Sequence, residues 1–291
     1  AGVPVTYVPT RPFMASSFYL GQRLKLPNPL ALLVNAALGS LWILRLQRAF
    51  RRRRPALLHT MSMWSHVFAG LAGRLAGLPV VWHFQEIMNP SSGFGLYRRM
   101  LRWWARWVPT RIVCISARVA RQFEGSARTR DKVDVVWNTI DTERFAPADD
   151  QGKDAGDGRP LTIGTAARFA RWKGHRVALQ AARQLKGRSI PFEWRFAGGE
   201  ALGAPGYRAH LLDLARRWGL EDHVRFVGWV DDMPSFYRSL DVLVHVPTEP
   251  EPFGLVPAEA MAAGLPVVAA SGGGLNAMVE AAGGVLVPPG Q

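Results

Sequence analysis

Short apolar runs alternate with longer amphipathic stretches over most of the chain. Each run is brief and is bounded by polar or turn residues, which is typical of a buried strand. Strands are expected at 4–8, 57–60, 79–84, 111–115, 133–137, 161–166, 192–197, 223–226, 241–246 and 266–270. Helical patterns lie between most of these runs. This alternation predicts an α/β fold with parallel sheets.

A long helix is predicted near the N-terminus. Asn28 is a suitable cap and Pro29 fits a first helical turn, and the helical pattern continues through arginines 51–54 until Pro55 ends it. The apolar run at 29–44 is shorter than the roughly 18 residues of a membrane-spanning helix. The four arginines have two interpretations. They form either a solvated helix C-terminus, where cations complement the helix dipole, or a contact with anionic lipid head groups.

A second basic and aromatic stretch, at 98–107, predicts an amphipathic helix. Its apolar side chains fall at i, i+3, i+4 and i+7, and its arginines lie on another face. The apolar set is Met100, Trp103, Trp104 and Trp107, and the basic set is Arg99, Arg102 and Arg106. The apolar stripe faces either the core or a membrane interface. No nucleic-acid-binding motif accompanies it, so no nucleic-acid partner is expected.

Composition adds two constraints. The net charge is +14, and it is one-sided: residues up to Phe145 carry 21 Lys and Arg against 6 Asp and Glu, whereas the remainder carries 15 against 16. A basic half favours an anionic partner, namely an acidic membrane surface, a phosphorylated acceptor or nucleic acid. The single cysteine, Cys114, lies in an apolar run, so a buried position and a reducing compartment are compatible with the sequence.

A segment poor in large apolar residues divides the chain. Residues 146–160 are rich in Asp, Gly and Ala, which is typical of an interdomain linker. The expected organisation is therefore an N-terminal domain at 1–145, a linker at 146–160 and a C-terminal domain at 161–291.

The stretch 248–268 carries the most informative chemistry. A helix is expected after Gly254, because Pro257 suits a first helical turn. Glu251 then lies on the loop that enters the helix, and Glu259 lies within it. An anion-binding helix N-terminus would be formed by the N–H groups of Phe253, Gly254 and Leu255. A carboxylate beside such a phosphate cradle suggests a sugar-nucleotide ligand.

Two cations upstream suit the same ligand. Arg168 and Lys173 are separated by four residues between a strand end and a helix start, so they can converge on a diphosphate, Arg as a fork and Lys as a point charge. By itself this spacing is weak evidence, because solvated basic residues are common on loops.

The segment Glu251-Pro-Phe-Gly-Leu-Val-Pro-Ala-Glu259, followed by Ala-Met-Ala-Ala-Gly-Leu-Pro-Val-Val, resembles the Glu-x7-Glu motif of family 4 retaining glycosyltransferases of the GT-B fold. Arg168 and Lys173 resemble the Arg-x4-Lys pair of that family. The segment at 138–145 is similar to its Asn-Gly-Ile-Asp-x-x-x-Phe pattern, with Thr139 in place of glycine. The resemblance extends over nearly the whole chain.

The resemblance implies an α/β GT-B fold, in which two Rossmann-like βαβ domains face a cleft, the first for the acceptor and the second for the donor. It implies transfer of a hexose, with retention, from a UDP- or GDP-sugar to a hydroxyl of a glycan, lipid-linked or small-molecule acceptor. No cofactor and no metal are expected, because two side-chain cations would stabilise the departing diphosphate. A cytoplasmic location is implied, in cell-envelope polysaccharide biosynthesis, with the basic half suited to the inner face of the cell membrane.

The resemblance also implies roles for particular residues. The expected catalytic set is Glu251, His83, Arg168 and Lys173, with Glu251 on the sugar hydroxyls. The expected donor-binding set is Glu259, Phe253, Gly254, Leu255, Gly228 and Gly273, with Glu259 on the ribose. His83 is assigned by its segment at 82–86, since a lone histidine is more often structural. Relatives place a glutamate where this chain has Asn276 and Ala277.

Family members generally begin with a strand and a glycine-rich loop ahead of the segment that matches residues 2–8, and they end with helices after a strand like the one at 285–287. The resemblance therefore predicts a fragment of a longer protein. Two other functions are compatible with parts of the sequence: a sugar-nucleotide epimerase of the same fold, and a non-enzymatic protein that binds anionic surfaces. The first leaves the two motifs unexplained, and the second leaves the C-terminal half unexplained.

Overall fold

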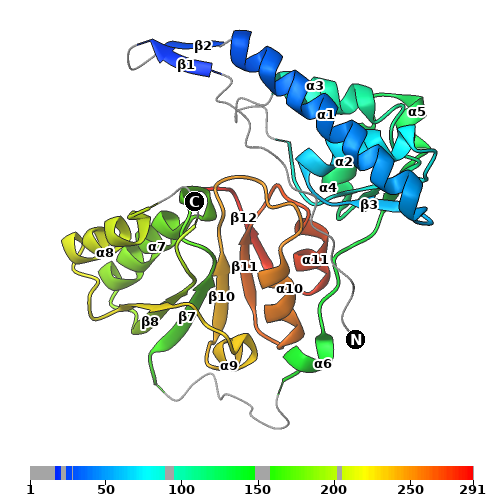
Figure 1. The fold of residues 1–291 in the computed structure, drawn as a ribbon. Coiled ribbons are helices and arrows are strands. Elements are labelled where there is room, and N and C mark those ends of the chain that lie inside the picture. The colour runs from blue at the N-terminus through cyan, green and yellow to red at the C-terminus, as the bar shows by residue number, and fades with distance from the viewer. Residues whose placement is uncertain are drawn as a thin grey trace. The chain divides into compact units, whose positions relative to one another are not determined.

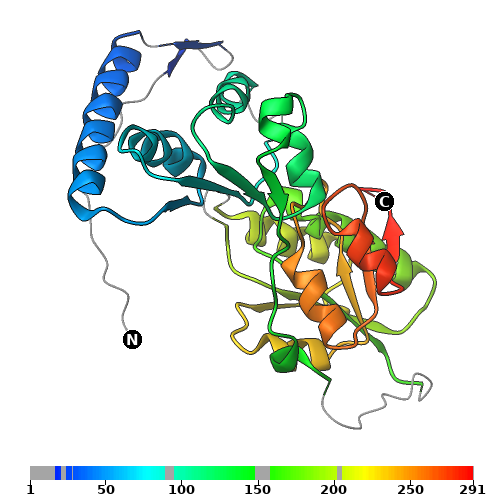
Figure 2. The ribbon, with the colours of Figure 1, turned by 90° about the vertical axis from the view of Figure 1, so that its right-hand side faces the viewer.

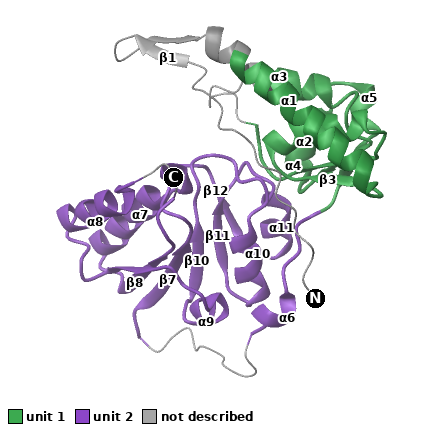
Figure 3. Cartoon of the chain, in the orientation of Figure 1, with its two compact units in different colours: residues 1–136 green, residues 137–291 purple. Residues whose placement is uncertain are grey.

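The computed structural model describes residues 17–20, 24–27, 29–88, 95–147, 158–201 and 205–290. The expected strand at 4–8, the Asn28 cap and most of the expected linker lie outside these ranges. The chain forms two compact units, residues 1–136 and 137–291 (Figure 3). The second unit thus begins before Phe145, the expected end of the first domain, and Phe145 packs in the second unit's core.

The first unit contains a parallel four-stranded sheet of order β3-β4-β5-β6. Its strands are β3 (Leu58–Thr60), β4 (Val80–Phe84), β5 (Arg111–Cys114) and β6 (Val133–Val135). Its helices are α1 (Pro29–Arg53), α2 (Met63–Leu75), α3 (Gly95–Trp104), α4 (Ala117–Ala120), the 3₁₀ turn η2 (Arg121–Phe123) and α5 (Ala127–Arg130). An antiparallel pair that the sequence did not predict, β1 (Ser17–Leu20) and β2 (Leu24–Pro27), precedes them.

Aromatic packing holds this sheet to its helices. Trp82 and Phe84 of β4 are buried, and Phe84 meets the ring of Phe123 edge-on at 4.8 Å between centroids. Cys114 is buried, as expected, and burial raises the pKa of its thiol to about 12. A buried, protonated thiol behaves as a small apolar side chain.

Helix α1 ends at Arg53, just before Pro55, as the sequence predicted. Arg51 donates a hydrogen bond to the carbonyl of Leu75 at the end of α2, at 3.2 Å, so this arginine has a structural role in joining two helices. Arg52 to Arg54 are exposed. Among the described residues, no helix is long and apolar enough to cross a membrane.

The core-facing interpretation of α3 is wrong for two tryptophans. Trp103 is 55% exposed and Trp107 is 51% exposed, whereas Leu101 and Ala105 are buried. The buried stripe of the helix is therefore rotated relative to the predicted one. Leu101 and Ala105 lie on the buried side, and the rings of Trp103 and Trp107 lie outside it.

The second unit contains a parallel six-stranded sheet of order β12-β11-β10-β7-β8-β9 (Figure 1). Its strands are β7 (Leu161–Ala166), β8 (Phe192–Ala197), β9 (Val224–Gly228), β10 (Val242–His245), β11 (Val267–Ala270) and β12 (Val285–Val287). Its helices are α6 (Thr142–Phe145), the 3₁₀ turn η3 (Arg171–Lys173), α7 (His175–Gly187), α8 (Tyr207–Arg217), α9 (Met233–Arg238), α10 (Leu255–Ala262) and α11 (Asn276–Ala281).

Helices cover both faces of this sheet (Figures 1 and 2). Leu179 of α7 and Leu211 of α8 pack with Trp194 of β8 in one buried cluster. On the other face, Tyr237 of α9, Ala260 of α10 and side chains of α6 and α11 pack against β10 and β11. Strands buried on both faces read as continuous apolar runs, which is why the sequence located them well.

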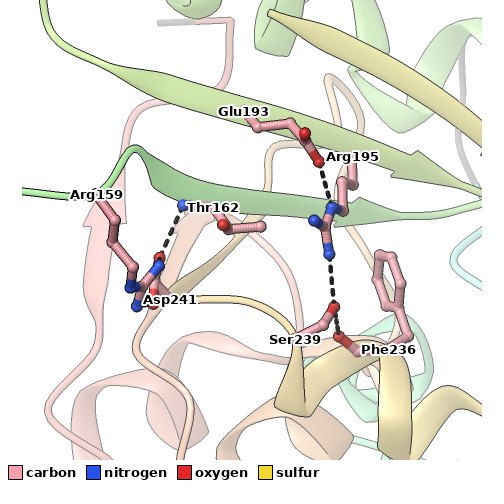
Figure 4. A network of polar contacts seen from close by, with 7 residues as sticks. All are labelled: Arg159, Thr162, Glu193, Arg195, Phe236, Ser239 and Asp241. Atoms are coloured by element: carbon pink, nitrogen blue, oxygen red, sulfur yellow. Dashed lines mark hydrogen bonds and ion pairs between the residues drawn. The ribbon is translucent and has the colours of Figure 1, made fainter. Parts of the chain in front are cut away.

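A polar network stabilises the edge of the sheet where β7 and β10 begin (Figure 4). Asp241 accepts hydrogen bonds from the guanidinium of Arg159 and, at 2.8 Å, from the backbone N–H of Thr162. Nearby, Arg195 is paired with Glu193 and donates to the hydroxyl of Ser239. The candidate site lies at the opposite edge of the sheet, at the carboxyl ends of the strands.

Candidate active site

Most of the predicted site residues follow the carboxyl ends of strands in the second unit. Arg168 and Lys173 follow β7, Gly228 ends β9, Glu251 follows β10 and Gly273 follows β11. In a parallel α/β sheet, ligands bind at this edge, at the point where the strand order reverses. That point lies between β7 and β10 here, because the chain runs outward from β7 through β8 to β9 on one side and from β10 through β11 to β12 on the other.

Two of the predicted catalytic residues meet directly at this point. The Nζ atom of Lys173 lies 2.7 Å from Oε2 of Glu251, and each side chain is only 13% exposed. The loops that carry them are tied together, because the N–H of Thr248 donates to the carbonyl of Trp172 at 2.8 Å. Gly174 allows the close approach: it has φ +78°, and a Cβ there would lie 1.7 Å from the carbonyl oxygen of Val246.

A histidine that the sequence did not single out completes this cluster. His245, the last residue of β10, is buried, and its Nε2 lies 3.3 Å from the same Oε2 of Glu251. Burial by itself would raise the pKa of Glu251, but the hydrogen bond with His245 and the charge of Lys173 outweigh it and lower that pKa to about 2. Glu251 is therefore ionised at neutral pH and acts as a hydrogen-bond acceptor only.

The glycine turn at 271–274 supports Glu251 through the backbone. A Cβ on Gly273 would lie 2.4 Å from the carbonyl oxygen of Glu251, and the N–H of Gly274 donates to that oxygen at 2.8 Å. Asn276 accepts a hydrogen bond from the N–H of Gly272 and closes the turn. Gly273 thus allows the glycine turn to approach the Glu251 loop closely, and its expected contact with the donor stays a prediction.

Helix α10 begins immediately after this loop. Gly254, with φ +98°, precedes the helix without a side-chain cap, and Leu255 is exposed. Phe253 is buried and its ring meets that of Trp137 edge-on at 6.0 Å. Phe253 therefore anchors the loop through packing, while Gly254 caps the helix and Leu255 is its first residue.

Glu259 is held by a second residue that the sequence did not indicate. The buried hydroxyl of Tyr237, on α9, donates to Oε2 of Glu259 at 2.7 Å. Burial and the negative charge of Glu259 both raise the pKa of Tyr237, so the hydroxyl stays protonated and remains a donor. This bond orients the carboxylate on the helix.

Arg168 and Gly228 occupy more open positions at the same edge. Arg168 is exposed, and among the described residues no salt bridge to it is found. Gly228 has φ +79°, and a Cβ there would meet nothing within 4 Å. Next to Gly228, Trp229 is 71% exposed and donates to Asp231.

His83 lies in β4 of the first unit. Its ring stacks on that of His59, with centroids 5.3 Å apart and planes 14° apart. Burial and the neighbouring His59 lower the pKa of His83, so the neutral form is favoured near neutral pH. In the parts of the chain that the structure describes, no group of three or more His, Cys, Asp or Glu side chains is placed to hold a metal ion.

Comparison with known families agrees with the motif. Residues 2–144 match the family described as Glycosyltransferase Family 4, and residues 149–291 match the family described as Glycosyl transferases group 1. The chain belongs to the family 4 glycosyltransferases. Curated members that it resembles include the D-inositol 3-phosphate glycosyltransferases of Salinispora tropica and Corynebacterium urealyticum, each 36% identical to it over 172 and 187 residues.

These alignments cover 54% and 60% of the chain, and 36% and 44% of the two relatives. The chain thus spans less than half the length of these relatives.

Solved structures that are similar to this chain confirm the predicted fold class. HepE of Anabaena, solved in complex with UDP and glucose, superposes with a TM-score of 0.74 at 25% identity, over 91% of this chain and 70% of HepE. Sucrose-phosphate synthase from Thermosynechococcus elongatus superposes with a TM-score of 0.69 at 20% identity, over 96% of this chain and 74% of the synthase. The two parallel-sheet units are those of a GT-B glycosyltransferase.

Proposed function

We propose that this family 4 glycosyltransferase moves a hexose from a UDP- or GDP-sugar to an acceptor hydroxyl with retention of anomeric configuration. The observation that carries the proposal is the Lys173–Glu251 contact at the point where the strand order reverses, supported by His245. HepE, which was solved with UDP and glucose, supports UDP as the carrier of the donor sugar. The acceptor class remains a glycan, a lipid-linked sugar or a small molecule.

The geometry suggests how the donor is held. Lys173 has three N–H donors, so it can keep its bond to Glu251 and still donate to a diphosphate oxygen. The exposed Arg168 supplies a guanidinium fork for the same group. Together the two cations stabilise negative charge that develops on the departing nucleotide, which is why we propose that the transfer needs no metal and no other cofactor.

Glu251 and Glu259 divide the remaining recognition. With a pKa of about 2, Glu251 cannot serve as a general acid at neutral pH, so we assign it to accepting hydrogen bonds from the donor sugar's hydroxyls. Glu259, oriented by Tyr237, would accept hydrogen bonds from the ribose. For His83, whose neutral form is favoured near pH 7, we propose a catalytic role.

The experiment is a nucleotide-release assay on the full-length protein with a panel of UDP- and GDP-hexoses and candidate acceptors. The proposal predicts acceptor-dependent release of one nucleotide, insensitivity to EDTA and an axial or equatorial product linkage that matches the donor by NMR. Inversion, or a metal requirement, would refute the corresponding part. Isomerisation of the donor without release would favour an epimerase, and no turnover with any donor would favour a non-enzymatic anion binder.

We also propose a cytoplasmic location, with attachment of the basic first unit to the inner face of the cell membrane. The exposed arginines 52–54 at the end of α1 support this. Replacing these three residues by glutamine should weaken cosedimentation with anionic vesicles. Undiminished cosedimentation would exclude this segment as the attachment point.

A further inference from the structure

A concave site in the first unit is lined by three arginines of one helix. The cavity, of about 320 Å³, lies between α3 with its following turn and the segment 123–129. The guanidinium-bearing lining residues are Arg99, Arg102 and Arg106, and the others are Trp103, Phe123, Gly125, Ser126 and Thr129. The volume is at the lower end of the range for small-molecule sites.

The three arginines converge because of helical spacing. Positions i, i+3 and i+7 lie on one face, so Arg99, Arg102 and Arg106 line one side of the cavity. None of the lining residues is acidic. The neighbouring Lys132 donates to the carbonyl of Arg106, and burial together with Arg74 and Arg128 lowers its pKa, which indicates a positive field around this side of the unit.

The opposite wall is shaped to hold one of these guanidinium groups. A Cβ on Gly125 would lie 2.2 Å from Nη2 of Arg102, so the guanidinium rests directly on the glycine backbone. Ser126, the residue before α5, makes no capping hydrogen bond with its side chain, which leaves the hydroxyl available toward the cavity that it lines. Phe123 is buried and gives the cavity an apolar floor.

We propose that this cavity, named here the α3 arginine pocket, binds a phosphate group. Arginine forks match phosphate oxygens in geometry and charge, a hydroxyl adds a neutral donor, and an uncompensated cationic cavity is stabilised by a divalent anion. The residue Trp103, 55% exposed, flanks the pocket and offers an aromatic surface for the organic part of the ligand. The phosphate belongs either to a small soluble ester or to a lipid head group.

The pocket lies away from the predicted active-site residues of its own unit. Arg106 follows α3 and precedes β5, so it lies toward the edge where the strands begin, whereas His83 is near the carboxyl end of β4. The pocket is therefore built from other residues than those proposed to bind the donor diphosphate.

The test uses two probes and three variants of the full chain. The probes are glycerol 3-phosphate, followed by calorimetry, and phosphatidylcholine vesicles with or without phosphatidylglycerol, followed by cosedimentation. The first variant combines Arg99→Gln, Arg102→Gln and Arg106→Gln. Its matched control combines Arg45→Gln, Arg48→Gln and Arg118→Gln, which removes the same charge from exposed arginines elsewhere in the unit. The donor site is unchanged in both, so their difference isolates the pocket.

The third variant, Gly125→Ala, moves the Arg102 guanidinium without removing charge. A methyl group there is relieved by a shift of a flexible side-chain end, so folding should be retained, and this variant carries the test if the triple variant misfolds. The pocket variant should bind at least one probe about tenfold more weakly or worse, and Gly125→Ala should bind it several-fold more weakly.

If the pocket variants bind glycerol 3-phosphate more weakly, a soluble phosphate ester is sufficient as ligand. If they bind only the phosphatidylglycerol vesicles more weakly, the ligand is a lipid head group in a membrane. Two results would overturn the proposal. In one, folded pocket variants bind both probes as the unmodified chain does; in the other, the control triple variant loses as much binding as the pocket triple variant.

Discussion

Replacing Lys173 by methionine tests the energetics of the candidate site. The substitution keeps the length of the side chain but removes the cation that lies 2.7 Å from Glu251. The carboxylate of Glu251 is only 13% exposed. Among the described side chains, it would then keep only its hydrogen bond with His245. Because a buried, unpaired charge is costly, the second unit should be destabilised.

The magnitude follows from the pKa of Glu251. A decrease from 4.5 to about 2 corresponds to about 3 kcal/mol of interaction favouring the ionised carboxylate. His245 and Lys173 supply this together, against the effect of burial. Losing Lys173 alone should therefore lower the free energy of unfolding by about 2–3 kcal/mol at pH 7.

The sign of the pH dependence is fixed as well. A carboxylate with a lowered pKa in the folded state contributes stability above pH 4.5, and this contribution is lost as the pH falls toward 2. The difference between the unmodified chain and Lys173→Met should therefore shrink to roughly half by pH 3. The double variant Lys173→Met with Glu251→Gln should recover most of the loss at pH 7.

The assay is urea unfolding at pH 7 and pH 3, with amide exchange of peptides from 161–270 to assign the transition to the second unit. An equal penalty at both pH values would refute the assignment of the loss to Glu251. A double variant that is no more stable than Lys173→Met would refute the pairing itself.

Three further substitutions test individual contacts. Tyr237→Phe removes the hydroxyl that donates a hydrogen bond to Glu259, and it should lower the free energy of unfolding in urea by about 1.5–3 kcal/mol. It should also raise the KM for the nucleotide sugar. An unchanged KM would show that Glu259 does not contribute to nucleotide-sugar binding. Gly273→Ala would place a Cβ 2.4 Å from the carbonyl oxygen of Glu251 and should lower kcat/KM about tenfold or more. The control Gly199→Ala, whose Cβ has its nearest contact at 3.7 Å, should leave kcat/KM unchanged. Equal effects of the two variants would contradict a role for the close approach at Gly273. Asp241→Asn weakens the pair with Arg159 at the opposite edge of the sheet and should lower the free energy of unfolding by about 1–2 kcal/mol. The kcat/KM of this variant should be unchanged at temperatures below the unfolding transition. A fall in kcat/KM there would link that edge to catalysis.

The strands of the second unit were predictable because they are buried on both faces. The bounds of β7 and β8 agree with the predicted runs at 161–166 and 192–197. Continuous apolar runs ended by polar or turn residues leave little freedom in placing such strands. The pair β1 and β2 lacks such a run and was missed.

Orientation around a helix was harder to predict than the helix itself. In α3 the sequence offers two overlapping stripes, one of tryptophans and one of Leu101 and Ala105, and period alone does not say which stripe packs. Leu101 and Ala105 form the stripe that is buried, while Trp103 is exposed and lines the α3 arginine pocket.

The predicted site residues came from motif spacing, but their supporting residues did not. His245 stands alone in an apolar strand, a setting in which a histidine is usually structural, and its contact with Glu251 depends on the turn between them. Tyr237 and Glu259 come from different helices, so no local pattern joins them. One usable signal existed for His245, since the last residue of a central parallel strand lies at the ligand-binding edge.

The most direct test of the proposed function compares two neighbouring carboxylates of the same loop. Glu251→Gln removes the charge that faces Lys173 and His245, and Glu249→Gln neutralises an exposed residue two positions earlier. In the nucleotide-release assay with UDP-hexose and acceptor, Glu251→Gln should reduce kcat/KM by about a hundredfold or more, and Glu249→Gln should leave it within about twofold. Equal rates for Glu251→Gln and the unmodified enzyme would contradict the role of this site in glycosyl transfer.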